Sequence, residues 1–288
     1  MHEHKDEYTI ARMAKALNVS ESGYYKWVKQ AFAPPTEKEL EDIALAIEIS
    51  DIFRRSRGSY GSRKITVLIN AGRSKEGKRS INHKRIERLM REYSMFSKTS
   101  KKYRCTTDSR HDDPIAENLL GRDFHAGRPN EKMVSDTTVI DTEEGDLYAA
   151  GIIDLYGRMP VGFAFSNKND RFLTMEALED MLKRGYGSKG CIMHSDRGST
   201  YTSGDYRDAL EKNDLICSMS GKGDCWDNSP MESFWGKMKS EWLAAKYKTR
   251  LEAIRDILEY VWVFYPNERP HASNGYMTPA DYYKQYTA

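Results

Sequence analysis

The sequence lacks any close pair of cysteines. Its four cysteines, Cys105, Cys191, Cys217 and Cys225, stand far apart without a C-x-x-C motif, and no histidine pair supplies the complementary spacing of a zinc site. We therefore expect reduced structural thiols rather than a disulfide framework or a zinc site. The seven histidines are scattered, and none accompanies a serine or cysteine in a recognisable nucleophilic arrangement.

Long hydrophobic runs are missing as well. The longest, residues 147–154 and 257–265, are far shorter than the ~20 residues that a helix needs to cross a bilayer, and no charged-then-apolar leader opens the sequence. We expect a cytoplasmic protein with no membrane partner. A chain of 288 residues with 39% hydrophobic residues can bury a sizeable core, which argues against disorder and predicts two or three compact units.

The net charge is small overall, but one segment has a large excess of positive charge. The net charge is only +2, yet residues 53–104 carry 17 lysines and arginines against 3 acids, while residues 1–52 and 105–288 sum to −4 and −8. A basic segment between acidic ones favours a polyanionic partner such as nucleic acid. The alternative is a helical surface whose charges are simply solvated.

Two short helices are predicted within residues 1–33, forming an N-terminal helix-turn-helix. Four apolar residues recur at helical spacing in the first helix: Ile10, Met13, Ala14 and Leu17. Asn18 and Val19 then make a turn, and Ser20 caps a second helix rich in aromatic residues. The pattern is compatible with DNA contact, but any small helical hairpin would look similar.

A basic helical DNA-binding domain is predicted over residues 36–96. It consists of a longer helix ending near Arg54 and a helical pair in residues 60–70 and 80–93, with Ser80 as the second cap. The residues expected to face its core are Ile81, Ile86, Leu89 and Met90. The cations expected to contact DNA are Arg63, Lys64, Lys84, Arg85, Arg88 and Arg91. They would mainly neutralise phosphates, which is a salt-sensitive contribution with little sequence preference.

The periodicity changes after a polar, turn-rich segment, residues 97–130, which we interpret as a linker. Three strand-like runs form an antiparallel meander, and a helix, a short strand, a helix, another short strand and helices through residues 230–264 follow. This order resembles the RNase H-like fold. Residues 131–288 are therefore predicted to form an α/β RNase H-like catalytic core, a mixed sheet flanked by helices, preceded by all-α helix-turn-helix modules.

Three carboxylates in this core occupy different local settings, 60 and 36 positions apart. Asp136 lies in an apolar strand, where an unpaired carboxylate is costly unless something binds it. Asp196 follows a strand end, where α/β sheets place their ligands, and Glu232 lies on a helix that begins near Ser229 and Pro230. Carboxylates of this kind can hold two Mg²⁺ ions for phosphodiester chemistry.

Each carboxylate also has a purely structural interpretation. Asp136 fits a polar edge strand, Asp196 a turn cap, and Glu232 a first-turn acid favoured by the helix dipole. Asp154 and Asp227 are other acids of the core, and hairpin or cap chemistry explains them better. Lys239 shares a helix face with Glu232 and could hold a substrate phosphate, or could simply face solvent.

Several linked motifs resemble one known family. In chain order they are KMVSDTTVI, GIIDLYGR, HSDRGSTYTS, SMSGKGDCWDNSPMESFWGKMKSEW and YPNERPHASNGYMTPADYY. Together they are similar to the OrfB portion of bacterial transposases of the insertion-sequence-three family, which belong to the DDE class and resemble retroviral integrases in their catalytic core. YGSRKI and RIERLMREY match the family's upstream helical domain, so the resemblance spans nearly the whole chain.

The resemblance implies that Asp136, Asp196 and Glu232 are the DDE triad and bind two Mg²⁺ ions, which Mn²⁺ can replace. The chain would be a metal-dependent DNA transposase that hydrolyses a phosphodiester at the element's end and attacks another strand with the freed 3′-hydroxyl. Its implied partners are the terminal inverted repeats, target DNA and further copies of itself on DNA. It would work in the bacterial cytoplasm, associated with the nucleoid when bound to DNA.

Two departures from the family pattern bear on this implication. Met133 stands where the family usually has an aromatic residue just before the first strand. The sequence also has no sustained heptad run, whereas members usually gain a helix-turn-helix and a leucine zipper from an upstream OrfA segment. An OrfA fusion or partner is therefore expected.

Two other functions are compatible with the sequence. A DNA-binding regulator would occupy element ends through the helical half without doing chemistry. A general RNase H-like nuclease would act on RNA-containing duplexes, although the helix-turn-helix segments argue against it.

Overall fold

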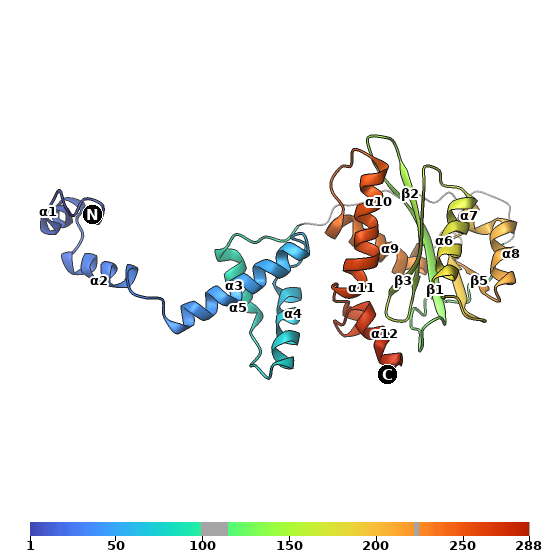
Figure 1. The fold of residues 1–288 in the computed structure, drawn as a ribbon, viewed down its shortest axis with the longest axis horizontal. Coiled ribbons are helices and arrows are strands. Elements are labelled where there is room, and N and C mark those ends of the chain that lie inside the picture. The colour runs from blue at the N-terminus through green and yellow to red at the C-terminus, as the bar shows by residue number, and fades with distance from the viewer. Residues whose placement is uncertain (99–114, 222–224, 288) are drawn as a thin grey trace. The chain divides into compact units, whose positions relative to one another are not determined.

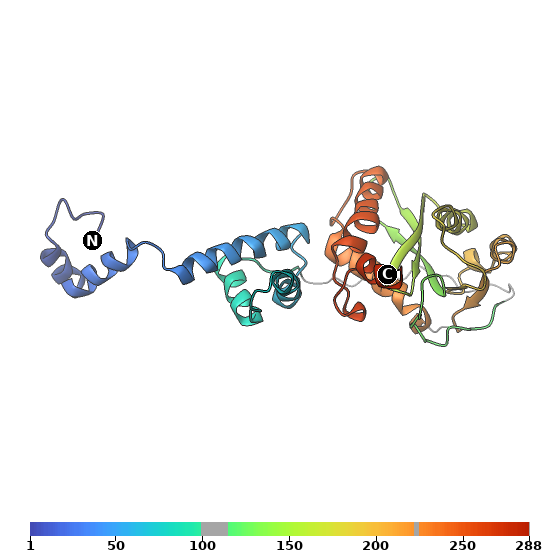
Figure 2. The same cartoon turned by 60° about the horizontal axis from the view of Figure 1, so that its bottom comes forward.

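The computed structural model describes residues 1–98, 115–221 and 225–287. The chain divides into two compact units, Met1–Ile49 and Ser50–Ala288. Figures 1 and 2 show the elements of both units in two views. Residues 99–114 of the predicted linker, including Cys105, lie outside the described residues.

The first unit contains the predicted pair of short helices, α1 (Ile10–Leu17) and α2 (Glu21–Ala31), and the start of α3 (Glu37–Arg55). Ser20 caps α2 as predicted, because its side chain accepts a hydrogen bond from the Gly23 amide at 3.0 Å. Asn18 ends α1 in the left-handed region, with φ of 53°. An aromatic cluster that includes His2 and Phe32, whose ring centroids lie 4.7 Å apart, packs beside α2.

The second unit begins with the end of α3 and the helical pair α4 (Ser62–Lys75) and α5 (His83–Glu92). The predicted core residues are confirmed as buried: Ile81, Ile86, Leu89 and Met90. The predicted Ser80 cap is wrong, because Asn82 caps α5 by accepting a hydrogen bond from the Lys84 amide. Both backbone polar groups of Ile81 bond to the Asn70 side chain, which holds the chain outside the helix until Asn82.

The predicted mixed sheet is confirmed. Its strands are β1 (Lys132–Ile140), β2 (Leu147–Asp154), β3 (Met159–Ser166), β4 (Ile192–Ser195) and β5 (Ile216–Met219). Their spatial order is β3-β2-β1-β4-β5. The first three strands form the expected antiparallel meander, and β4 and β5 extend the sheet in parallel from β1.

Helices cover both faces of the sheet (Figures 1 and 2). On one face lie α6 (Arg171–Lys183), α7 (Ser199–Thr202) and α8 (Gly204–Lys212). On the other face lie α9 (Ser229–Lys237), α10 (Arg250–Glu259), α11 (Tyr265–Asn267) and α12 (Pro279–Thr287). A 3-10 turn at Cys225–Asn228 leads into α9, and another at Ala272–Asn274 lies between α11 and α12. The π-helical turns at Met238–Trp242 and Tyr260–Phe264 extend α9 and α10.

The predicted helical region through residues 230–264 is interrupted between Trp242 and Arg250. Thr249 starts α10 with a capping box, in which its side chain accepts from the Glu252 amide and the Glu252 side chain accepts from the Thr249 amide. This signal is present in the sequence as T-x-x-E, and it marks a new helix rather than a continuation.

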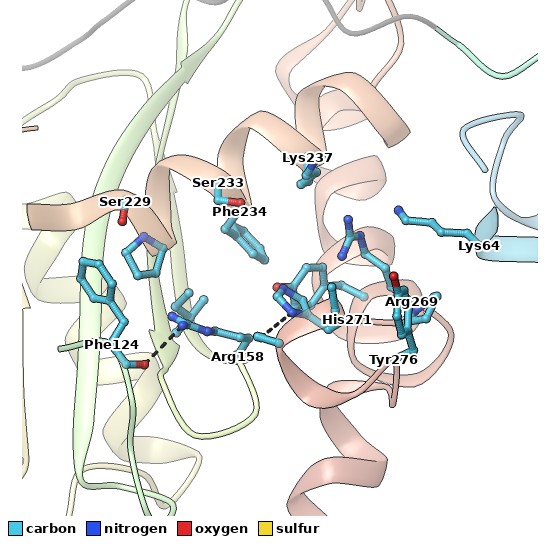
Figure 3. Close-up of a pocket in the computed structure, with 16 residues that line it drawn as sticks. Lys64, Phe124, Arg158, Ser229, Ser233, Phe234, Lys237, Arg269, His271 and Tyr276 are labelled. Carbon is cyan, nitrogen blue, oxygen red and sulfur yellow. Dashed lines mark hydrogen bonds between the residues drawn. The ribbon is translucent and has the colours of Figure 1, made fainter. Parts of the chain in front are cut away.

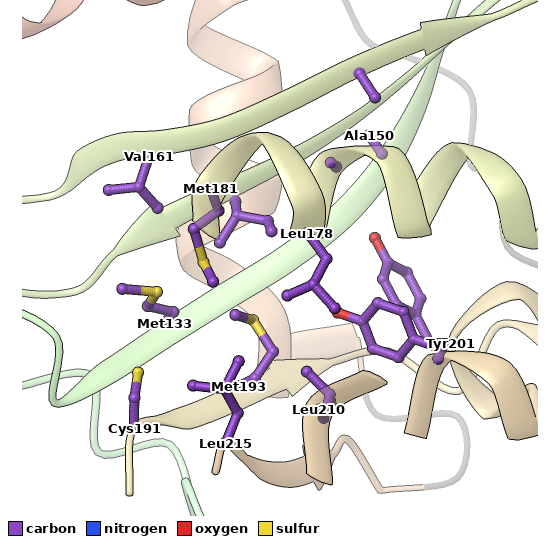
Figure 4. Close-up of a cluster of buried hydrophobic side chains, with 14 of the residues drawn as sticks. Met133, Ala150, Val161, Leu178, Met181, Cys191, Met193, Tyr201, Leu210 and Leu215 are labelled. Atoms are coloured by element: carbon purple, nitrogen blue, oxygen red, sulfur yellow. The ribbon is translucent and has the colours of Figure 1, made fainter. Parts of the chain in front are cut away.

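The main hydrophobic core lies between the sheet and the α6 to α8 face (Figure 4). Met133 and Met193 point into it from neighbouring strands, and Met181 of α6 packs against them. Gly162 of β3 allows α6 to come close, because a Cβ at this position would lie 2.5 Å from the carbonyl oxygen of Ala177.

Residues 115–130 contain no helix or strand, yet they pack against the sheet. Leu120 and Ala126 are buried, and the Leu119 amide donates to the Ser218 hydroxyl at 3.0 Å. Cys191, directly before β4, and Cys217 of β5 are free thiols. Among the described helices, none is both long and apolar enough to cross a bilayer.

Asp154 at the end of β2 is a fully buried carboxylate with a structural role. It accepts hydrogen bonds from the Asn130 amide at 2.7 Å, the Tyr156 amide at 2.9 Å and the Tyr283 hydroxyl. It therefore ties the β2–β3 turn to the segment before β1 and to α12. Burial nevertheless raises its pKa to about 6.

This raised pKa predicts a pH-dependent contribution to stability. The folded state holds the Asp154 proton more tightly than the unfolded state, whose pKa is 3.8. The favourable contribution is therefore complete below about pH 4 and is lost as the pH rises through about 6, a change of roughly 3 kcal/mol. The variant Asp154→Asn cannot lose this contribution, because its side chain does not titrate. We therefore expect the free energy of unfolding of Asp154→Asn, measured with urea, to move closer to that of wild type as the pH rises from 4 to 6. Asp208→Asn on α8 is the control, and parallel curves for both variants would contradict the prediction.

Candidate active site

Asp136 of β1 and Asp196, which directly follows β4, lie at the same level of the sheet. Val134 of β1 pairs with His194 of β4 in parallel register, and Asp136 and Asp196 each follow two residues later. Neighbouring strands are roughly 4.8 Å apart, so the two aspartates are brought side by side. Asp196 directly follows β4, which confirms the predicted placement at a strand end.

The two aspartates share the sheet face that α9 covers. Met133 and Ser135 of β1 point the other way, where Met133 enters the main core and the Ser135 hydroxyl donates to the Tyr201 hydroxyl at 2.8 Å. Because side chains alternate along a strand, Asp136 must point toward the α9 face. Met193 of β4 also enters the main core, and Asp196 is three residues later, so the same alternation places Asp196 on the α9 face.

Glu232 comes to this face on α9, whose start is tied to β1. The Asn228 side-chain amide donates to the carbonyl oxygen of Ser135 at 2.9 Å, directly beside Asp136 in the chain. Pro230 occupies the first turn of α9, as predicted, and Glu232 lies in the same turn with an exposed side chain.

A glycine lets α9 pack closely at this point. Gly151 of β2 pairs with Asp136, and a Cβ at Gly151 would lie 2.8 Å from the ring of Trp235 and 2.6 Å from the ring of Phe163. Trp235 is buried and lies one helical turn after Glu232. The bare backbone at Gly151 thus sets the height of α9, and with it the position of Glu232, over the sheet.

The predicted site residues influence one another's pKa values. Burial raises the pKa of Asp136 well above its ordinary value, and the negative charges of Asp196 and Glu232 raise it further, while Lys239 opposes them. Burial lowers the pKa of Lys239, and Asp136 and Asp141 counteract this. Desolvation raises the pKa of Glu232 as well. The site therefore has an excess of negative charge that a cation would relieve.

The donor chemistry fits a hard divalent cation, since all three side chains offer carboxylate oxygens. In the described part of the chain, however, no three His, Cys, Asp or Glu side chains are gathered closely enough to hold a metal ion. The strand aspartates are neighbours, whereas Glu232 is exposed on a helix. A single ion bound by all three carboxylates thus requires Glu232 to turn toward the strands, and the triad assignment stays a prediction.

Local hydrogen bonds shape the loop that carries Asp196. Its Oδ1 accepts from the Gly198 amide at 2.9 Å, the turn interaction that the sequence allowed for. Arg197 donates through Nε to the carbonyl oxygen of Ser220. His194, which sequence reasoning did not single out, is buried with its ring nitrogens 2.9 Å from the Ser218 hydroxyl and 3.2 Å from the Ser220 hydroxyl. It locks the end of β4 to β5.

Asp227 has structural partners, as the sequence suggested. It accepts from Arg122 Nε at 2.7 Å, from the Asn118 side chain at 2.9 Å and from the Gly221 amide at 2.8 Å. It thus fastens the segment before β1 to the turn that leads into α9. These bonds and the Arg122 charge hold its pKa below the ordinary value against the effect of burial.

The predicted DNA-contacting cations lie in different surroundings. Arg63, Lys84, Arg88 and Arg91 are exposed, and Arg85 is half-buried. On α5, Arg88 pairs with Glu92 at 3.1 Å and Arg91 with Glu87 at 3.6 Å, so acids offset part of the positive charge of this helix. Lys64 reaches Glu241 at 3.1 Å. A role in DNA contact stays a prediction for all of them.

Family models match most of the second unit. Residues 126–225 match a model described as an integrase core domain, and residues 213–279 match a second model with the same description. Residues 39–103 match a model described as an HTH-like domain.

Curated relatives match nearly the whole chain. An uncharacterised 31 kDa protein of insertion element IS600 from Shigella sonnei is 38% identical over 275 residues, which are 95% of this chain and 98% of the relative. The transposase InsF for insertion sequence IS3A from Escherichia coli K12 is 31% identical over 280 residues, which are 97% and 95% of the two chains.

Solved structures with a similar arrangement include the HTLV-2 integrase catalytic core domain in complex with magnesium. It is 13% identical, with a TM-score of 0.43, covering 55% of this chain and 99% of that one. A simian T-cell lymphotropic virus intasome in complex with the PP2A regulatory subunit B56 gamma is 11% identical, with a TM-score of 0.45 and coverage of 77% and 74%.

The close packing of α9 on Gly151 predicts that this position tolerates no side chain. We expect Gly151→Ala to lower the free energy of unfolding by about 1–3 kcal/mol, because the Trp235 and Phe163 rings must move. Gly236→Ala is the matched control on α9, where a Cβ meets open space, and it should be neutral or stabilising by up to about 1 kcal/mol. Denaturant unfolding measures both, and equal stabilities would refute this account of α9.

Proposed function

This chain belongs to the insertion-sequence-three (IS3) family of transposases, and on that premise we propose that it is a DDE-class catalytic subunit. It would cleave and join DNA strands at the ends of an insertion sequence, using Asp136, Asp196 and Glu232. The observation that carries the proposal is the pairing of Val134 with His194, which places Asp136 and Asp196 two residues further along neighbouring chain segments, where burial and then the charge of Asp196 raise the pKa of Asp136. A site built in this way is suited to bind cations and anionic substrates together.

Two bound Mg²⁺ ions, which Mn²⁺ can replace, would supply nucleophile activation and stabilisation of the leaving oxygen. Asp136 and Asp196 would hold them from the rigid sheet, and Glu232 would complete the set from α9. Because two ligands are fixed by strand pairing, only the helix-borne carboxylate has to adjust when ions and DNA arrive.

The reaction needs no covalent bond to the protein. In the first step a water oxygen bonds to phosphorus and gives up a proton to solvent, while the bond to the 3′-oxygen breaks and that oxygen takes up a proton to become a free 3′-hydroxyl. In the second step this hydroxyl gives up its proton as its oxygen bonds to phosphorus in another strand, and the 3′-oxygen that it displaces takes up a proton. The task of the protein is to hold both strands in line for these displacements.

Lys239 is proposed to hold a substrate phosphate beside the carboxylates. It lies in the π-helical turn after α9, and Asp136 and Asp141 favour its charged form even though burial disfavours it. A cation in this position can approach a DNA phosphate without competing for the metal-binding oxygens.

The proposed partners follow from the helical domains. The α4 and α5 pair exposes cations, and the HTH-like match covers it. Terminal inverted repeats and target DNA are the proposed ligands, and a homo-oligomer assembled on DNA is the proposed active form. An OrfA segment, fused or supplied separately, is proposed to add the oligomerising helix that the sequence lacks.

A second candidate is a regulator that occupies element ends without chemistry. The observation that favours it is that the described carboxylates are not gathered into a group that could hold a metal ion. Binding of element-end DNA without any Mg²⁺-dependent product, even with OrfA supplied, would select this function.

The catalytic proposal predicts the effect of single amide substitutions. Asp136→Asn, Asp196→Asn and Glu232→Gln each remove one anionic ligand and keep the side-chain shape. We expect each to reduce Mg²⁺-dependent cleavage and strand transfer on element-end DNA to background, while DNA binding in EDTA persists. The measurement is product formation on labelled duplexes that carry the terminal repeat.

Two exposed acids on α8 provide matched controls for these variants. Asp208→Asn and Glu211→Gln make the same chemical changes outside the site and should retain wild-type activity. Undiminished cleavage by any of the three site variants would remove that residue from the catalytic set.

A further inference from the structure

A cationic cavity lies against α9 and includes none of the three predicted carboxylates. Its volume is about 380 Å³, within the range of pockets that take small ligands or parts of larger ones. Figure 3 shows its lining: Lys237 and Ser233 come from α9, Arg158 from the β2–β3 turn, Arg269 and His271 from the segment after α11, and Lys64 from α4.

Arg158 is the least compensated cation of this cavity. One of its guanidinium nitrogens, Nη2, donates to the carbonyl oxygen of Phe124 at 3.2 Å. The other, Nη1, is buried and has no hydrogen-bond partner among the described residues. Burial lowers its pKa, and only Tyr265 opposes the effect, so no described carboxylate balances the charge. A guanidinium placed in this way is costly unless an anion joins it.

The other cations leave the cavity positive. Glu241 accepts two hydrogen bonds from Arg269, at 2.8 and 2.9 Å, and one from Lys64 at 3.1 Å, so a single carboxylate serves two cations. Lys237 adds a further charge with no ion pair among the described residues. Four positive groups thus face one negative group.

The behaviour of His271 agrees with this imbalance. Burial lowers its pKa to about 4, and the charges of Arg269, Arg158 and Lys64 contribute, so the ring is neutral at physiological pH. It is also held by contact with the Ser273 hydroxyl at 2.8 Å. Burial and the surrounding positive charge therefore prevent His271 from becoming a fifth cation of the cavity. A cavity with this excess of positive charge is suited to bind an anion.

We propose that this cavity binds a backbone phosphate of the DNA strand on which the active site acts, with Arg158 and Lys237 as its main donors. The proposal rests on the proposed function. The fork of donors on a guanidinium matches phosphate oxygens, and the Ser233 hydroxyl adds a neutral donor. Phe124 and Tyr276 form flat walls against which the sugar or base of the same nucleotide can lie.

The position on α9 favours DNA over a small free anion. Glu232 and the cavity residues Ser233 and Lys237 belong to one helix of nine residues. Lys237 follows Glu232 by five residues, roughly 7.5 Å along the helix axis, which corresponds to about two nucleotides along one strand of B-DNA. A strand with one phosphate near Glu232 can therefore place a neighbouring phosphate in the cavity.

The test measures binding of the full chain to an element-end duplex, with EDTA present to prevent cleavage. Arg158→Gln and Lys237→Gln should each weaken binding by about tenfold and reduce the slope of log affinity against log salt by roughly 0.9. Lys212→Gln, an exposed lysine on α8, is the control and should leave both quantities unchanged. Unchanged affinity and slope for both cavity variants would overturn the proposal.

Neutral methylphosphonates locate the contact. Replacing phosphates one by one should reveal a position where wild type loses about tenfold in affinity and Arg158→Gln loses nothing more, because the partner is already absent. If every position weakens Arg158→Gln as much as wild type, the DNA contact is refuted. Thermal unfolding with inorganic phosphate forms a separate arm: stabilisation of wild type alone, with DNA binding equal in all variants, would assign the cavity to a free anion and overturn the DNA proposal.

Failure of this proposal is distinguishable from failure of the proposed function. Wild type that binds the duplex but never cleaves it with Mg²⁺, while Arg158→Gln binds weakly, contradicts the catalytic function and supports the cavity. Wild type that cleaves, with both cavity variants binding normally, supports catalysis and overturns the cavity. A wild-type chain without affinity for the duplex contradicts both.

Discussion

The parallel pairing of β1 with β4 is the constraint on which the site depends. The pairing of Val134 with His194 fixes the relative height of two strands that are far apart in the sequence. Asp136 and Asp196 follow from that register without further adjustment, because side chains two residues apart share a sheet face. A slip of one residue would turn Asp136 into the core that Met133 fills. Strand register therefore controls the relative position of the two aspartates as strictly as it controls packing.

The third carboxylate depends on a weaker kind of constraint. Glu232 is placed by the packing of Trp235 over Gly151 and by the hydrogen bond from Asn228 to Ser135. These contacts fix the helix axis but leave an exposed side chain free to rotate. The difference between two carboxylates placed by the sheet and one placed by a helix explains why the charges of Asp196 and Glu232 both act on Asp136 although the described residues contain no closed group of three.

Local patterns in the sequence predicted the strands, most of the helices and the local setting of each aspartate, because alternation and strand ends are local properties, whereas the equal level of the two aspartates follows from long-range strand register. The Asn82 cap was missed because the bonds between Asn70 and Ile81 are made across eleven residues. Arg158 was missed for a similar reason: it reads as an ordinary turn residue, and only the fold shows that its guanidinium is buried without a counter-charge. Contacts between residues far apart in the sequence determine both features, and the periodicity of the sequence does not predict such contacts.

The helix α9 joins two regions of opposite charge, and this arrangement suits a substrate that is itself charged along its length. Repulsion among carboxylates at one region would drive DNA away unless cations intervene, whereas the positive cavity attracts it directly. The two regions share a rigid helix, so a strand held in the cavity is also held at a fixed distance from Glu232. Binding energy gained at the cavity can therefore orient the phosphodiester at the carboxylates, which is how positioning contributes to rate in phosphoryl transfer.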